Sequence, residues 1–181
     1  MSVHTNPYTE LSNKHKEVFD TLSAARGGLK GMYSTLFHHP ELATIVSQLG
    51  TYLRYEGVLN PHDTEIVILS TARAINAGFV WQQHLSPAHT AGVDPQLVQG
   101  ILDDDEVFFS AQPERTQLIY KIARYAALAD TVPKRTLELG LSSIGKTAVI
   151  EIVVISGFYR MITSVVKAFE VPLPKPKSPP F

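Results

Sequence analysis

The chain has 181 residues, of which 44% are hydrophobic and 18% are charged, a balance that predicts one folded domain and excludes extended disorder. Its 16 basic and 17 acidic side chains give a formal net charge of -1. Because the basic residues form no long run, we expect no nucleic-acid partner. The sequence has no cysteine, which excludes disulfides, zinc–thiolate sites and thiol nucleophiles.

The sequence predicts neither a targeting segment nor a membrane segment. The N-terminal stretch MSVHTNPYTELSNKHKEVFD is polar and lacks the apolar core of a signal peptide, so we expect a cytoplasmic protein. The most apolar stretch, TAVIEIVVISGFYRMI, is interrupted by Glu151 and Arg160. It therefore predicts a buried helix, and we expect no membrane partner.

The chain opens with helical patterns. Residues 1–40 are expected to form a helical extension packed on the core, with one helix that ends before Gly27-Gly28 and a short one that stops before Pro40. From Glu41 to Gly57 apolar residues recur at helical spacing and predict an amphipathic helix. Its predicted inward face comprises Leu42, Ile45, Val46, Leu49 and Leu53.

The next segment predicts a helical hairpin. Asn60 is a suitable N-cap, Pro61 suits the first helical position, and the helix should run to about Asn76, where Ala77-Gly78 breaks it. A second helix then starts at Phe79. We expect Ser86-Pro87 to interrupt or restart that helix before Gly92 closes it.

The rest of the chain continues the helical pattern. A short helix is predicted after Asp94-Pro95, and the acidic run 103–106 that follows is interpreted as a solvated loop. An amphipathic helix is then predicted over 113–129, a short helix over 131–140 and a long apolar helix over 144–170. No segment alternates as a strand does, so the fold class is all-α, a single-domain bundle of about eight helices. The core domain should span 41–173, followed by a proline-rich tail, 174–181.

Polar residues stand on the inner faces of the predicted hairpin. Glu65 and Asn76 share a stripe of the first helix with Arg73 beside it, and His84 lies one turn after Val80 on the second helix with Trp81 nearby. A purely structural interpretation remains open, in which Glu65 caps its helix and His84 is a core histidine. In that interpretation Arg73, Asn76 and Trp81 are structural as well.

The segment from Thr64 to Gly92 resembles the signature of the carboxymuconolactone decarboxylase/AhpD-like family. The resemblance is carried by Thr64-Glu65, Phe79-Val80-Trp81, His84, Ala88 and Ala91-Gly92, and it extends from about Leu42 to Leu173. It implies an AhpD-like helical bundle that assembles as trimers or hexamers. The peroxidase branch of the family has a CxxC where this sequence has Ala77 and Val80, so this chain resembles a cysteine-free member without peroxidase activity. The decarboxylase branch has an acidic residue where this sequence has Val80.

These residues favour a cofactor-free lyase or isomerase that acts by acid–base chemistry on a small carboxylated lactone or β-keto acid. His84 would donate and accept the proton, Glu65 would orient it, and Arg73 or Arg160 would anchor the substrate carboxylate. Trp81, Asn76 and Tyr159 complete the expected substrate-binding set.

Other functions remain open at this point. The alternative from another class is a non-catalytic small-molecule binder or oligomeric scaffold. The apolar last helix and the proline-rich tail favour a homo-oligomer. A metal site is a weaker hypothesis, because neither His38-His39 nor His84 with His89 has the i, i+4 spacing of helical ligands, and no metal or cofactor is expected.

Overall fold

The computed structural model describes residues 6–26, 28, 29, 31–172 and 181, and within them the chain forms ten α-helices, two short helical turns and no strand. The predicted all-α class is confirmed. The elements are η1 (Pro7–Glu10), α1 (Asn13–Arg26), α2 (Met32–Leu36), α3 (Pro40–Thr51), η2 (Tyr52–Glu56), α4 (Pro61–Ala74), α5 (Gly78–Thr90), α6 (Pro95–Asp103), α7 (Glu106–Ser110), α8 (Glu114–Leu128), α9 (Lys134–Ser143) and α10 (Lys146–Ala168).

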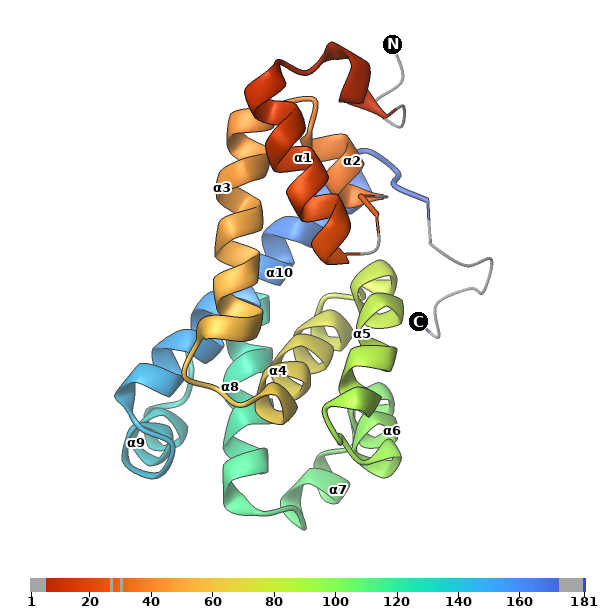
Figure 1. Cartoon of the computed structure of the whole chain (residues 1–181). Coiled ribbons are helices and arrows are strands. Elements are labelled where there is room, and N and C mark those ends of the chain that lie inside the picture. Colours follow the sequence, from red (N-terminus) through yellow and green to blue (C-terminus); the bar gives the residue numbers. More distant parts are fainter. Residues whose placement is uncertain (1–5, 27, 30, 173–180) are drawn as a thin grey trace.

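Helix α4 lies at the centre of the bundle, between α5 and α8 and against α10 (Figure 1). It begins as predicted, because the Asn60 side chain accepts a hydrogen bond from the Asp63 backbone N–H at 2.8 Å and Pro61 occupies the first turn. Every residue from Asp63 to Ala72 is buried. A helix buried on all sides is a core element, and its polar side chains need partners from other helices.

The predicted interruption of the hairpin's second helix is wrong. Helix α5 runs through Pro87 to Thr90. Proline removes one backbone donor, but Ala88 is fully buried and the next turn closes through Ala91 N–H to the Pro87 carbonyl at 2.8 Å. Burial of Ala88 and this backbone hydrogen bond therefore outweigh the missing one.

The acidic run 103–106 is only partly the solvated loop that the sequence favoured, because Asp103, Asp105 and Glu106 are exposed but Asp104 is half-buried. Asp104 adopts a left-handed conformation and pairs with Arg124, and it also accepts a hydrogen bond from the Tyr120 hydroxyl at 2.6 Å. Asp105 caps α7 by accepting from the Phe108 N–H at 2.9 Å. The partners of Asp104 lie on α8, which the local sequence could not indicate.

The predicted inward face of the helix from Glu41 is confirmed at Val46 and Leu53, which are buried, but it differs at the other positions. Leu42 and Ile45 are 43% and 62% exposed, whereas the buried positions include Ala43, Ser47 and Gly50. A Cβ atom at Gly50 would lie 3.0 Å from the Phe158 ring, so this face uses small residues to pack closely. Volume at the contact, rather than hydrophobicity alone, determines which side faces inward.

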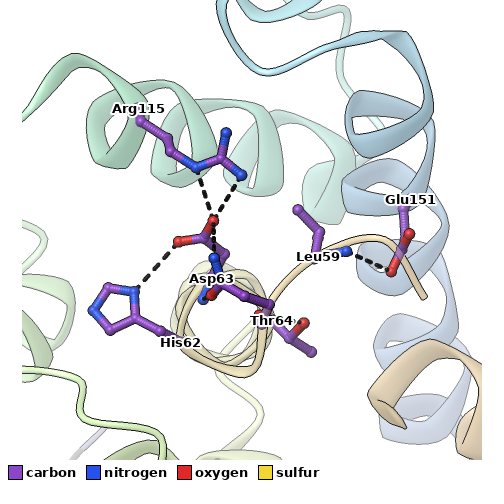
Figure 2. A network of polar contacts seen from close by, with 7 residues as sticks. Leu59, His62, Asp63, Thr64, Arg115 and Glu151 are labelled. Atoms are coloured by element: carbon purple, nitrogen blue, oxygen red, sulfur yellow. Dashed lines mark hydrogen bonds and ion pairs between the residues drawn. The ribbon is translucent and has the colours of Figure 1, made fainter. Parts of the chain in front are cut away.

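Helix α10 is long and apolar enough to cross a membrane by length and composition, but 56% of its most apolar window is buried inside the fold. Its Glu151 is itself buried and reaches the segment between η2 and α4. The carboxylate accepts hydrogen bonds from the Val58 N–H at 2.7 Å and the Leu59 N–H at 3.5 Å, the second of which Figure 2 shows. A Cβ atom at Gly57 would lie only 1.9 Å from Glu151 Oε1.

The Glu151 contact predicts opposite effects for two glycine substitutions. Gly57→Ala should lower the free energy of unfolding by about 1–3 kcal/mol, because the added methyl group displaces the carboxylate. Gly157→Ala on α10 is the control, since its Cβ would meet nothing within 4 Å, and it should stabilise by about 0.5–1 kcal/mol. Urea unfolding of both variants measures the difference, and equal effects would contradict the packing described.

Candidate active site

The α4–α5 hairpin brings Glu65 and His84 into direct contact. Glu65 Oε2 lies 2.7 Å from His84 Nδ1, and the two residues are only 5% and 6% exposed. Glu65 lies in the second turn of α4, and His84 lies near the middle of α5. The sequence suggested this pairing, and its length is that of a charge-assisted hydrogen bond.

Arg54 is a third member of this group that the sequence analysis missed. Its Nη2 lies 3.5 Å from Glu65 Oε1, and its Nε is buried with no partner among the described residues. Arg54 belongs to η2, a π-helical turn, which is an element often found at functional sites. The sequence signal was weak: a basic residue between two tyrosines in the stretch YLRYEG that precedes α4.

Burial determines the charge state of the histidine. Removal from water lowers the pKa of His84 below the ordinary value of 6.5, and this outweighs the opposing effect of the Glu65 carboxylate. Arg54 lowers the pKa further. The ring is therefore neutral near pH 7, its Nδ1–H donates to Glu65, and Nε2 carries the lone pair. Glu65 with His84 can accept one proton as a unit.

A cavity of about 770 Å³ opens beside this pair. Its walls come from η2, the first turns of α4 and the last turns of α5, and they include Arg54, Asn60, His62, Glu65, Ser86 and Thr90. The volume is that of a small-molecule site. Of the two residues, Glu65 forms part of the cavity wall. His84 is connected to the cavity through its hydrogen bond to Glu65.

Two of the predicted substrate-binding residues lie beside His84. The Tyr159 ring packs edge-on against the imidazole, with the ring centroids 5.0 Å apart. Trp81 is buried in the core one turn before His84 and contacts the Phe181 ring at 5.5 Å. These aromatic groups exclude water on the core side of the pair.

Neither Trp81 nor Tyr159 forms part of the cavity wall, and the other three predicted residues lie away from both the wall and His84. Arg73 donates from Nε to the Leu102 carbonyl at 2.6 Å, and Asn76 is exposed beside it. Arg160 donates to the Ala127 carbonyl at 3.3 Å beside a separate pocket of about 230 Å³. Arg73 and Glu65 share a side of α4, but they are about 12 Å apart along its axis.

Histidine and acidic residues elsewhere do not form a metal centre within the described ranges: no group of three His, Cys, Asp or Glu side chains there could hold a metal ion. His39 instead caps α3 by accepting from the Leu42 N–H at 3.5 Å. The side chains of the cavity wall can supply proton transfer and charge stabilisation.

Comparison with solved structures places the chain in a class of all-helical folds that includes an enzyme. It is similar to the crystal structure of a cysteine-to-alanine variant of the debrominase Bmp8 in complex with 2,3,4-tribromopyrrole. The TM-score is 0.74 at 14% sequence identity, and the match covers 93% of this chain and 88% of that chain. No protein-family model and no curated protein matched the sequence.

The lowered pKa of His84 predicts a pH dependence of stability. As the pH falls through about 6.5, His84 takes up a proton in the unfolded chain but stays neutral in the folded chain. The free energy of unfolding should therefore fall. His84→Gln keeps a donor for Glu65 but removes this titration, so the slope from about pH 7 to about pH 5 should be flatter than in the wild type. Chemical unfolding across this range measures the slope. The exposed His89, changed to Gln, is the control and should keep the wild-type slope, and a wild-type slope in His84→Gln would contradict the assignment.

Proposed function

We propose that this protein is a cofactor-free lyase or isomerase that acts by acid–base chemistry on a small carboxylated lactone or β-keto acid. The observation that carries the proposal is the buried Glu65–His84 pair, whose carboxylate forms part of the wall of a cavity of about 770 Å³. The resemblance of the Thr64–Gly92 segment to the carboxymuconolactone decarboxylase/AhpD-like family supports the same reaction class.

The residues at the cavity cover the needs of such a reaction. A carbon acid needs a base for its proton, or an acid for its carbanion, and a cation for the enolate oxygen. The Glu65–His84 pair supplies the proton site, and the Arg54 guanidinium supplies the positive charge for a substrate carboxylate or enolate. Arg54 thus takes the anchoring role that the sequence assigned to Arg73 or Arg160.

The likeness to a debrominase supports an enzymatic role for this fold and no particular substrate. A reaction through a thiolate is not open to this chain, because it has no cysteine. The second candidate function, a non-catalytic binder of a small carboxylated molecule, is favoured by the close packing of Val80, which is 2% exposed and stands where the family has a cysteine or an acidic residue. Both candidates use the same cavity, and turnover distinguishes them.

The catalytic assignment predicts how two substitutions change turnover. His84→Ala should lower turnover by about 10²- to 10⁴-fold while the fold persists, since general acid–base groups contribute that much. Glu65→Gln keeps the size and loses the charge, so it should lower turnover at least as much if Glu65 contacts the substrate itself. The measurement is release of CO2 from acetoacetate and related β-keto acids, with lactones followed by NMR.

Thermal stability of the same variants separates catalysis from folding. If His84 were only a core histidine, His84→Ala would lower stability by about 1–3 kcal/mol and activity would follow the folded fraction. His89→Ala, on the exposed side of α5, is the matched control and should keep full activity. A folded and fully active His84→Ala protein would refute the catalytic role.

We also propose that the protein is a homo-oligomer, with a trimer or hexamer favoured. Several large apolar side chains of α3, η2 and α10 are exposed in the single chain, among them Ile45 at 62%, Tyr55 at 69% and Ile150 at 54%. Exposed apolar surface of this kind supports association with further copies.

Light scattering should therefore give a mass that is a multiple of 20.0 kDa. Ile45→Lys should lower that mass by placing a charge in the interface. Val107→Lys is the control, because Val107 is 80% exposed on α7, away from these helices, and it should leave the mass unchanged. A 20.0 kDa species at micromolar concentration would reject the oligomer.

A further inference from the structure

A second histidine–carboxylate pair borders the same cavity. His62, in the first turn of α4, forms part of the cavity wall, and its Nδ1 lies 3.3 Å from Asp63 Oδ1 (Figure 2). The His62 side chain is 39% exposed, whereas that of Asp63 is only 8% exposed. One end of this pair is therefore in contact with solvent and the other end is fixed in the core.

The rest of the network holds Asp63 in place. Asp63 Oδ2 accepts hydrogen bonds from Arg115 Nε at 2.9 Å and from Asn60 Nδ2 at 3.1 Å, and it forms an ion pair with Arg115 Nη2 at 2.8 Å. Figure 2 shows the guanidinium of α8 facing this carboxylate from the side opposite the histidine. These contacts engage Oδ2, which leaves Oδ1 for the imidazole. A carboxylate fixed in this way orients the ring and favours the tautomer with a proton on Nδ1.

His62 and Glu65 are one helical turn apart, and both belong to the cavity wall. Residues at this spacing have Cβ atoms about 5–6 Å apart on the same side of a helix. The two proton sites differ in their access to water, because the Glu65–His84 pair is buried and His62 is half-exposed. A substrate in the cavity would thus meet one shielded and one solvent-exchanging proton site on the same face.

We propose that His62 is a second proton carrier of this cavity, with Asp63 as its positioning residue, and that the reaction is a proton shift between two carbons of a small unsaturated carbonyl compound. This inference rests on the proposed function and narrows it to isomerisation. The Glu65–His84 pair takes the proton from the α-carbon, and the C–H electron pair delocalises into an enolate whose oxygen faces Arg54. The γ-carbon then forms its new C–H bond with the proton of the protonated His62. The pair returns its proton to solvent and His62 takes one up, so atoms and charge balance.

The isotope content of the product tests this assignment, with α-angelica lactone in deuterium oxide as the probe and NMR as the readout. The wild type should place solvent deuterium at the γ-carbon, because the exposed His62 exchanges with water. In His62→Gln turnover should fall by about 10²-fold or more, and the residual product should retain the substrate hydrogen returned by the shielded pair. His89→Gln is the matched control and should behave as the wild type.

The outcomes separate this inference from the proposed function. Unchanged turnover and unchanged deuterium content in His62→Gln would overturn the role of His62 and leave the Glu65–His84 assignment intact. Turnover of β-keto acids without any isomerisation of the lactone would overturn the proton shift alone. If neither the lactone nor the β-keto acids react, the proposed function itself is refuted, and this inference with it.

The role of Asp63 has a readout that needs no substrate. Long-range ¹⁵N–¹H correlation spectra of the neutral ring should show His62 with its proton on Nδ1. Asp63→Asn should shift the population toward the Nε2–H form, and Arg115→Gln, which leaves the carboxylate in place, should shift it less. A wild-type His62 that is mainly protonated on Nε2 would overturn the positioning role.

Discussion

The structure depends on the burial of α4 along its whole circumference from Asp63 to Ala72. This stretch carries five polar residues, Asp63, Thr64, Glu65, Ser70 and Thr71. A buried polar group without a partner costs about 1–3 kcal/mol, and a buried charge costs more, so hydrogen-bond partners from the neighbouring helices stabilise the polar side chains of α4. Arg115 comes from α8, His84 from α5, and Ser156 from α10, whose hydroxyl accepts from Thr71 at 3.1 Å. The bundle is arranged around these bonds as much as around its apolar core.

Stability alone does not explain two carboxylates in the first turns of a central helix. Each buried ion pair loses hydration that its Coulombic attraction only partly restores, and apolar residues of similar volume are often as stable or more so. Both carboxylates are buried next to the cavity. Glu65 forms part of its wall, and Asp63 orients His62, which also forms part of the wall. Polar groups that are expensive to bury are concentrated where proton chemistry can use them.

Local signals in the sequence predicted the centre of this arrangement. Asn60-Pro61 marks the start of α4, and a short break before the next helix places Glu65 and His84 face to face. The remaining contacts connect residues that are distant in sequence. Glu151 and Val58 are far apart along the chain, and so are Arg115 and Asp63. Periodicity shows which side of a helix is polar, but it does not show which helix supplies the partner. For that reason the sequence indicated Arg73 and Arg160 as anchors and gave no indication of Arg54.

The first turns of α4 are held from three directions. His84 holds Glu65 from α5, Arg115 holds Asp63 from α8, and the Glu151 carboxylate of α10 holds the backbone that enters the helix. The segment bonded by Glu151 lies between Arg54 and Asn60, two residues of the cavity wall, so its position sets the distance between the guanidinium and the Glu65 carboxylate. Electrostatic catalysis requires charges that are fixed before the substrate arrives, since reorientation during the reaction raises the barrier. A site on one helix terminus that three separate helices hold in place meets that requirement.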